Sequence, residues 1–412
     1  MSIEIKMAWR NIWRNSRRSI LTILAIVFAT LLLVFMLSFQ FGSYDTMINT
    51  AVKIHTGHVQ VQAEGYRDKM DVRLAVPNPG AVDNVIKNID GIEAYTSRAN
   101  AFSLVSSSDR TYGVLLTGID PEREAEVSTL KKLVRRGKYL AQEDTDMALV
   151  GELLARNLKT DIGDELVVLG QGRDGSVAAS VLKVKGIFTS GEDTFDRNSV
   201  QMPLGYFQEV FSMRGAVHEV VVLGRSLGEV KRIKEELGAG VKGIDGDGSL
   251  LVLDWMELMP GLVQSIKLDL VSGLIMYFIL IVVVAFSILN TFLMAIFERK
   301  REFGVLMAIG MAPGRLMKSL FLESAMITGI GIILGIISGG MVTGYFQAHG
   351  ILISGASEVL SQYGLPDRLY PQLSLLSISI GAGIVLIITI LTAIYPVLKV
   401  RLLRPVEAMT AV

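Results

Sequence analysis

The sequence predicts an α-helical membrane protein with four transmembrane helices plus an α+β domain on the external, periplasmic side. Three observations predict this fold class. Half of the 412 residues are hydrophobic and only 19% are charged, which is too apolar for an ordinary soluble enzyme. Four long stretches carry no charge. The segment between the first two stretches has the mixed composition of a folded domain.

Each uncharged stretch is long enough to cross a hydrocarbon layer of about 30 Å, which requires roughly 20 helical residues. We expect transmembrane helices at residues 20–41, 270–297, 324–346 and 373–398. The first stretch follows basic residues, as the apolar region of a signal peptide does, but it is longer than such a region. We therefore expect an uncleaved membrane anchor.

Ionisable residues are absent from the middle of all four expected spans. An ion-coupled transporter usually needs such residues within the membrane, and a hydrophilic conduit would need a polar lining. The energy source for any transport should therefore lie outside this chain.

Basic residues gather in the segments 1–19, 298–323 and 399–412. The positive-inside rule places these segments in the cytoplasm, so that residues 42–269 and 347–372 lie outside. We expect a multi-pass protein of the bacterial inner (plasma) membrane with cytoplasmic N and C termini. The formal net charge is zero, which provides no basic field for nucleic acid.

The N-terminal segment has the pattern of an amphipathic helix that lies in the membrane interface. Aromatic and aliphatic residues alternate with arginines in MAWRNIWRNSRR, residues 7–18. Tryptophan prefers the headgroup layer, and basic residues are attracted to anionic lipid. The expected membrane-interface residues are Trp9, Trp13, Arg17 and Arg18. The alternative is a basic flank that only sets the topology.

The external segment alternates between strand patterns and helix patterns. Strands are expected at His58–Gln62 and Leu166–Leu169, and helices at Ala81–Asn88, Leu204–Phe211 and Leu227–Leu237. A segment of this length can bury its own core. We expect that core to be divided between two subdomains.

One subdomain should pair residues near 50–115 with residues near 200–255, and the other should occupy roughly 120–195. Amphipathic stretches at 42–54 and 255–270 predict stalk helices that continue the first two spans. Because residues near 50–115 pair with residues near 200–255, the chain would leave the first subdomain and later return to it.

Several patterns resemble ligand-binding motifs, but their contexts favour simpler structures. Gly170, Gly172 and Gly175 match G-x-G-x-x-G, yet a strand pattern follows where a dinucleotide site needs a helix. A hairpin loop is the better interpretation. His55 and His58 have no third ligand nearby, so a metal site is disfavoured.

Asp245–Gly248 lacks the later glutamate of a calcium loop, and Lys138 lacks the surrounding residues of a nucleotide-binding P-loop. The chain has no cysteine, which excludes disulfides and thiolate sites. We therefore expect no catalytic residue, no cofactor and no metal in this chain.

The third expected span carries glycine at four-residue spacing. Small residues on one helix face let two helix backbones approach closely. The predicted packing residues are Gly331, Gly335 and Gly339, with Gly340 and Gly344 on an adjacent stripe. The partner helix could belong to the same chain or to another.

The connection between the second and third spans is charged at its start, then apolar, and then broken at Pro313–Gly314. This pattern predicts a short helix lying across the membrane face. Its apolar residues are Phe303, Leu306, Met307 and Ile309. A connector without a partner would not need an exposed apolar face, so a docking role is expected.

The sequence resembles the FtsX-like permeases, the family that includes LolC/LolE and MacB, over essentially its whole length. The resemblance rests on four segments in order. They are AWRNIWRNSRRSILTILAI, RRGKYLAQEDTDMALVGELLARNLKTDIGDEL, ERKREFGVLMAIGMAPGRLMKSLFLES and YPVLKVRLLRPVEAM.

This resemblance implies an external domain with a porter-like part and an inserted part, and a dimer of permeases bound to two copies of a separate ABC ATPase. ATP and Mg would be bound by that ATPase, and the permease itself would not be an enzyme. The implied ATPase-coupling residues are Glu298, Arg299, Lys300, Arg301, Glu302, Phe303, Leu306, Met307, Ile309, Pro313 and Arg315.

The mechanism so implied is mechanotransmission, in which closure of the ATPase pair drives the external domains through a conformational cycle. HTGHVQVQAEGY, after the first span, looks most similar to the LolC/LolE branch, which implies release of lipoproteins for outer-membrane delivery. Implied partners are a second permease copy or homologue, a lipoprotein or other amphiphilic cargo, and a periplasmic carrier.

The hairpin expected at Gly170–Ser180 is shorter than the carrier-recruiting hook of LolC-type proteins, so the chain is either LolE-like or handles a different cargo. The alternatives are MacB-like efflux of peptides or amphiphiles and FtsX-like signalling to a cell-wall hydrolase. A membrane-anchored enzyme has no nucleophile–base pair to support it.

Overall fold

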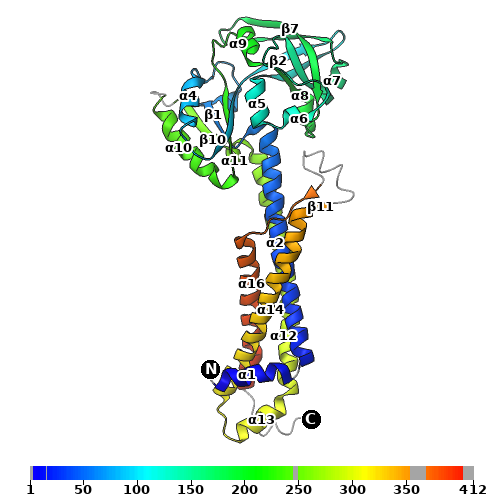
Figure 1. Cartoon of the computed structure of the whole chain (residues 1–412), viewed down its shortest axis with the longest axis vertical. Coiled ribbons are helices and arrows are strands. Elements are labelled where there is room, and N and C mark those ends of the chain that lie inside the picture. The colour runs from blue at the N-terminus through cyan, green and yellow to red at the C-terminus, as the bar shows by residue number, and fades with distance from the viewer. Residues whose placement is uncertain (1–2, 15, 245–248, 353–367, 402–412) are drawn as a thin grey trace. The chain divides into compact units, whose positions relative to one another are not determined.

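The computed structural model describes residues 3–14, 16–244, 249–352 and 368–401, and these form two compact units. The helical unit lies within residues 3–44, 265–352 and 368–401. The α+β domain lies within residues 45–264. Figure 1 shows the elements of both units.

Four helices of the described chain are long and apolar enough to cross a membrane, as expected. They are α2 (Ser16–Ala51), α12 (Pro260–Glu298), α14 (Pro313–His349) and α16 (Leu375–Arg401). Helices α2, α12 and α14 have 36, 39 and 37 residues and are longer than a bilayer requires; most of the expected stalk residues 42–54 and 255–270 lie in α2 and α12. Helix α14 begins at Pro313 rather than at residue 324, because proline suits the first position of a helix.

Two shorter helices complete the end of the helical unit near the N-terminus (Figure 1). They are α1 (Ile3–Arg14) and α13 (Lys300–Ala308). Helix α1 buries Ala8 and Ile12 and exposes Trp9 and Trp13. This is the one-sided pattern of an interfacial helix.

The glycine stripe of α14 lies against α2. A Cβ atom at Gly331 would be 2.6 Å from Ile26 Cγ2, and one at Gly335 would be 2.5 Å from Thr30 Cβ. Gly339 similarly faces Leu31 of α2. The partner of this face is therefore in the same chain.

The adjacent stripe behaves differently. A Cβ atom at Gly340 or Gly344 would meet no described atom of this chain within 4 Å. The expected packing role of these two glycines finds no partner within the described residues.

The α+β domain is built on one mixed sheet of ten strands, with the order β10-β1-β9-β2-β3-β8-β5-β7-β4 and β6 paired with β2 and β7. The strands are β1 (Val59–Ala63), β2 (Ile92–Ser106), β3 (Thr111–Ile119), β4 (Val134–Gly137), β5 (Met147–Gly151), β6 (Glu165–Gln171), β7 (Val177–Phe188), β8 (Ser199–Pro203), β9 (Glu219–Gly224) and β10 (Leu250–Asp254).

The helices of this domain are α3 (Tyr66–Lys69), α4 (Pro79–Ile86), α5 (Pro121–Val127), α6 (Leu130–Leu133), α7 (Glu152–Leu158), α8 (Asp193–Asn198), α9 (Leu204–Val210), α10 (Val230–Lys242) and α11 (Trp255–Leu258). A π-helical segment, η1 (Val52–Thr56), and a short 3-10 segment, η2 (Leu227–Glu229), are also present. In the helical unit, β11 (Ile351–Leu352) pairs with β12 (Arg368–Leu369).

The domain has two large cores, but they do not follow the expected division, because β2, β3 and β8 lie in one core with the strands of residues 120–195. One core joins β1 and β9 to α4 and α10. A second joins β2, β3 and β8 to β5, β6, β7 and α7. Strand β2 is 15 residues long and pairs with β9 at one end and β6 at the other, so the sheet continues across both cores.

One face of the second core's sheet is exposed and apolar. Leu104 of β2 pairs with Leu169 of β6, and Val167 of β6 pairs with Val181 of β7. The exposed fractions of six of its side chains run from 47% to 76%. We call this surface the apolar sheet face: Phe102, Leu104, Val167, Leu169, Val177, Ala179 and Val181.

Candidate functional site

The candidate site is the connection between α12 and α14, which contains α13. Helix α12 ends at Glu298, and Arg299 turns the chain with φ −102°. Helix α13 ends before Gly310, whose φ of +101° favours glycine. Pro313 then starts α14. The break expected at Pro313–Gly314 therefore lies just before these residues.

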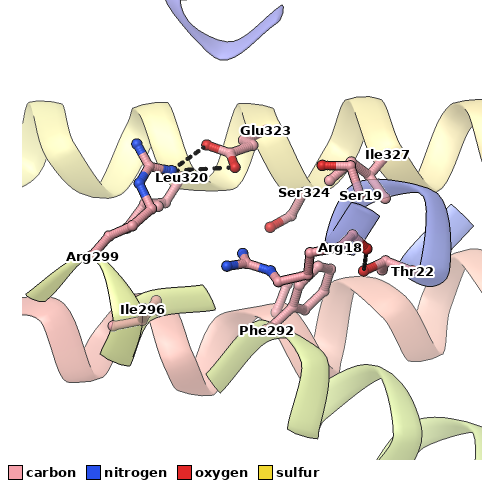
Figure 2. Close-up of a pocket in the computed structure, with 11 residues that line it drawn as sticks. Arg18, Ser19, Thr22, Phe292, Ile296, Arg299, Leu320, Glu323, Ser324 and Ile327 are labelled. Atoms are coloured by element: carbon pink, nitrogen blue, oxygen red, sulfur yellow. Dashed lines mark hydrogen bonds and ion pairs between the residues drawn. The ribbon is translucent and has the colours of Figure 1, made fainter. Parts of the chain in front are cut away.

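Arg299 anchors α13 to α14. Its Nη1 lies 3.1 Å from Glu323 Oε2, and its Nε lies 3.2 Å from Glu302 Oε2. Arg299 and Glu323 are each 8% exposed. Figure 2 shows the two side chains pointing toward each other. Removal of one partner from a buried ion pair typically costs about 3–5 kcal/mol, so this pair fixes the geometry.

Two further ion pairs join the connection to the N-terminal segment. Arg14 at the end of α1 pairs with Glu302, and Arg18 of α2 pairs with Glu298 at 3.0 Å. Partial burial alone would raise the pKa of Glu302, but hydrogen bonds from Arg14 and Arg299 outweigh it and hold that pKa below its usual value. Helix α13 is therefore tied to α1 as well as to α14.

The apolar side chains of the connection do not all form a docking face. Phe303 is 1% exposed and packs with Ile296, Leu316 and Leu320. Leu306 packs against the same cluster. The expectation that Phe303 is exposed for a partner is wrong, because the end of α12 and the first turns of α14 cover it, whereas Leu306 is only half-buried.

A different set of side chains is exposed on α13. Val305 is 43% exposed and Ile309 is 80% exposed, and Arg301 and Ala308 are exposed as well. Positions 301, 305, 308 and 309 follow the spacing of one helix face. We call this surface the exposed stripe: Arg301, Val305, Ala308 and Ile309.

The remaining expected coupling residues divide between the interior and the surface. Lys300 and Met307 are half-buried, while Pro313 and Arg315 are exposed.

Sequence reasoning missed Arg14, Val305 and Glu323. Glu323 closes the segment ERKREFGVLMAIGMAPGRLMKSLFLES, and a lone acidic residue next to an apolar span was the available signal.

A small cavity of about 30 Å³ lies beside the Arg299–Glu323 pair. Figure 2 shows polar side chains of α2 and α14 around it, among them Ser19 and Ser324. A cavity of this size has room for about one water molecule. It is lined by Arg18, Ser19, Thr22, Phe292, Ile296, Arg299, Leu320, Glu323, Ser324, Ile327 and Ala393.

The expected interface residues lie next to the same connection. The Trp9 and Trp13 rings are in edge contact at 5.9 Å between centroids, and both are exposed. Arg17 is exposed and Arg18 is half-buried by its pair with Glu298. The Ser19 hydroxyl donates to the Ile12 carbonyl at 2.7 Å, which holds α1 against the start of α2.

The histidines near η1 have separate structural partners. His58 Nδ1 accepts a hydrogen bond from Gly224 N–H at 3.0 Å, while the His55 carbonyl accepts one from Arg98. Among the described residues there is no group of three or more metal-ligating side chains.

The other motif positions also fall where turns and strand ends lie. The G-x-G-x-x-G segment forms the β6–β7 hairpin, as expected. Lys138 directly follows β4, and its N–H donates to the Lys185 carbonyl at 3.1 Å. Asp245–Gly248 lies outside the described residues.

The fold and this site define a multi-pass membrane protein whose long helices continue into a large α+β domain. Residues 19–239 match the family described as the MacB-like periplasmic core domain, and residues 274–405 match the FtsX-like permease C-terminal family. The chain belongs to this FtsX/MacB/LolC family of ABC transporter permeases, and it is a multi-pass inner-membrane protein.

Individual relatives are distant but cover most of the chain. The lipoprotein-releasing system transmembrane protein LolC of Xylella fastidiosa is 22% identical over 73% of this chain and 74% of its own length. The ABC transporter permease YknZ of Bacillus subtilis is 23% identical over 98% of both chains.

Among solved structures, the periplasmic region of MacB from Actinobacillus actinomycetemcomitans aligns with 52% of this chain and 94% of its own. The TM-score is 0.39 and the identity 13%.

Proposed function

We propose that this chain is the permease subunit of an ATP-driven exporter of the mechanotransmission type that releases lipoproteins from the inner membrane. A separate ABC ATPase, which binds ATP and Mg, docks on the exposed stripe of α13. The observation that carries this proposal is the way α13 is held. Its buried side is fixed to α12, α14 and α1, while apolar and basic side chains remain exposed on the other side.

A rigid connector with an exposed apolar stripe is suited to transmit a displacement of the bound ATPase to the membrane helices. The ion pairs of Arg299 with Glu302 and Glu323 join α13 to α14, so a displacement of α13 must move α14 or break a buried pair. ATP binding can then select one of two helix arrangements by binding more tightly to the ATPase pair in that arrangement.

The amphiphilic cargo class is supported by the apolar sheet face. Soluble domains rarely expose contiguous apolar surfaces of this kind unless something binds there. The relatives named as lipoprotein-releasing proteins favour lipoprotein within that class. The short β6–β7 hairpin favours a LolE-like role or a MacB-like cargo such as a peptide or another amphiphile.

A second permease copy or a homologue is proposed as the membrane partner. In the most apolar stretch of α12, 6% of the residues are buried within this chain, compared with 39% in the most apolar stretch of α2. Lipid and another permease are the two surfaces that can cover such a helix in a bilayer.

The test is reconstitution of the chain with its ATPase in vesicles that contain a lipoprotein. ATP-dependent release is expected, and ATP turnover without release would refute this cargo. A change in drug susceptibility on deletion would favour efflux, and capture of a cell-wall hydrolase by the protein would favour signalling.

Docking is tested with Ile309→Asp, since a charge at the most exposed apolar position of α13 should remove ATPase association. Ile162→Asp is the control, because Ile162 is a 44% exposed side chain of the α+β domain. Both variants should insert in the membrane. Unchanged association for Ile309→Asp would contradict the docking assignment.

A further inference from the structure

The first stalk helix ends in a π-turn at the edge of the α+β domain. Helix α2 runs directly into η1, and Gly57 N–H donates to the Val52 carbonyl across it at 2.7 Å. The φ of Gly57 is +72°, and a Cβ atom there would be 2.3 Å from Val221 Cγ1, so only glycine fits. π-turns are rare and occur frequently at functional sites.

A buried arginine of the sheet holds this turn. Arg98 of β2 donates from Nη1 to the His55 carbonyl. The other edge of its guanidinium pairs with Glu124 of α5, with Nε 2.9 Å from Oε2 and Nη2 2.7 Å from Oε1. The Arg98 and Glu124 side chains are 0% and 1% exposed. The guanidinium therefore bridges the turn and a second element of the domain.

Two further contacts join η1 to the inserted part of the domain. Thr129, which follows α5, donates its N–H to the Lys53 carbonyl at 2.8 Å. The Phe195 ring of α8 lies 5.3 Å from the His55 ring between centroids. The turn is thus contacted by β2 and by residues near 129 and 195.

The segment that leaves the α+β domain toward α12 also lies beside η1. Strand β10 pairs with β1 so that Asp254 lies opposite Val59, and Trp255 N–H donates to the His58 carbonyl at 3.0 Å. Trp255 begins α11, which precedes α12 in the chain. Both connections between the α+β domain and the long helices therefore converge beside η1.

Stability alone does not require this arrangement. A buried ion pair is often no more stabilising than well-packed apolar residues of similar volume. The Arg98 guanidinium donates to the His55 carbonyl of the turn, and the Thr129 N–H donates to the Lys53 carbonyl. A shift of the stalk would leave these buried groups unpaired, so the turn and the domain must move together or change partners in a discrete step.

We propose that η1, Arg98 and Glu124 form the joint through which movement of α2 is passed to the α+β domain, with Arg98 as a positioning residue. This inference rests on the proposed function, because it requires that the partner ATPase moves the long helices.

The test replaces both charged members of the buried pair. Arg98→Met combined with Glu124→Leu should keep the fold and remove the link to the His55 carbonyl. A second variant, Thr129→Pro, removes the N–H that Thr129 donates to Lys53. Proline fits there, since Thr129 has φ −82° and Ser128 before it is extended.

The control is Arg136→Met with Asp161→Leu, an ion pair of the same domain that is more than half exposed. All variants are studied as full chains with the ATPase. Hydrogen exchange of the α+β domain is measured with and without ATP, together with lipoprotein release and ATP turnover.

We expect the control to behave as the unmodified protein. Both joint variants should keep ATPase association and ATP turnover, lose the ATP-dependent change in hydrogen exchange, and release lipoprotein roughly tenfold more slowly. Joint variants that respond to ATP as the control does would overturn the inference alone. An unmodified protein whose α+β domain does not respond to ATP would overturn the proposed function and the joint with it.

Discussion

At the scale of single residues, His218 is held in a neutral form by its surroundings. Its side chain is fully buried, its Nδ1 accepts from Asn100 N–H at 2.8 Å, and its Nε2 lies 3.0 Å from the Val72 carbonyl, to which it donates. The Tyr66 ring stacks on the imidazole at 4.9 Å. Burial lowers the pKa of His218 from 6.5 to about 4.

This shift predicts acid sensitivity of the α+β domain. Below pH 6.5 the unfolded chain binds a proton at position 218 that the folded domain does not bind until about pH 4. Stability is therefore fully present above pH 6.5 and falls between pH 6.5 and 4, by about 3 kcal/mol from this residue. Hydrogen exchange of the β2 and β9 segments as a function of pH measures the loss.

The matched variant is His218→Gln, which cannot titrate. Burial raises the pKa of the neighbouring Glu219, and this works in the opposite direction, but it is common to both proteins. The difference between the two pH profiles isolates His218. Parallel profiles between pH 6.5 and 4 would contradict the assignment.

The site residues show which residue roles a sequence can predict. Ile309 was expected on an exposed apolar face and Arg315 among the coupling residues that the resemblance implies, and both side chains are exposed. Phe303 and Arg299 were expected to face a partner, but they pack and pair within the chain. Apolar periodicity identifies a helix face without saying what covers it, and the Arg299–Glu323 contact depends on how α12 and α14 approach each other.

At the scale of elements, the glycine stripe of α14 sets the approach of α14 to α2. We expect Gly335→Ala to lower the free energy of unfolding of the helical unit by about 1–3 kcal/mol, because its Cβ atom would lie 2.5 Å from Thr30 Cβ. Thermal unfolding of the purified protein in detergent measures the effect.

Gly340→Ala is the control, since it makes the same change in helix propensity where the described chain leaves open space. It should be neutral or slightly stabilising. An equal loss of stability for both variants would show that the stripe does not depend on contact with α2.

The helices and strands themselves were predictable where apolar residues recurred at a regular spacing over the whole element. The expected strands at 58–62 and 166–169 correspond to β1 and β6, and the expected helices correspond to α4, α9 and α10. The π-turn was not predictable, because it depends on Arg98 and Thr129 reaching the carbonyl groups of residues distant in sequence. The continuity of the sheet was likewise hidden, since it follows from how the long β2 pairs at its two ends.

At the scale of the whole molecule, hydropathy was sufficient to predict four spans, because an apolar run of about 20 residues has few other stable environments. The orientation depends on weaker information, the distribution of lysine and arginine. It is also the property on which the proposed ATPase docking depends, since α13 would have to face the compartment that contains ATP.

The chain has no cysteine, so single cysteines can report orientation without removal of native thiols. Asp109 of the α+β domain and Arg301 of α13 are both exposed, and substitution of each by cysteine should leave the fold intact. In intact spheroplasts, a membrane-impermeant maleimide should label Asp109→Cys directly and Arg301→Cys only after permeabilisation, because the bilayer separates the two. Labelling of both positions before permeabilisation would place α13 outside the cell, where no cytoplasmic ATPase could bind it, and docking and transport would fail together.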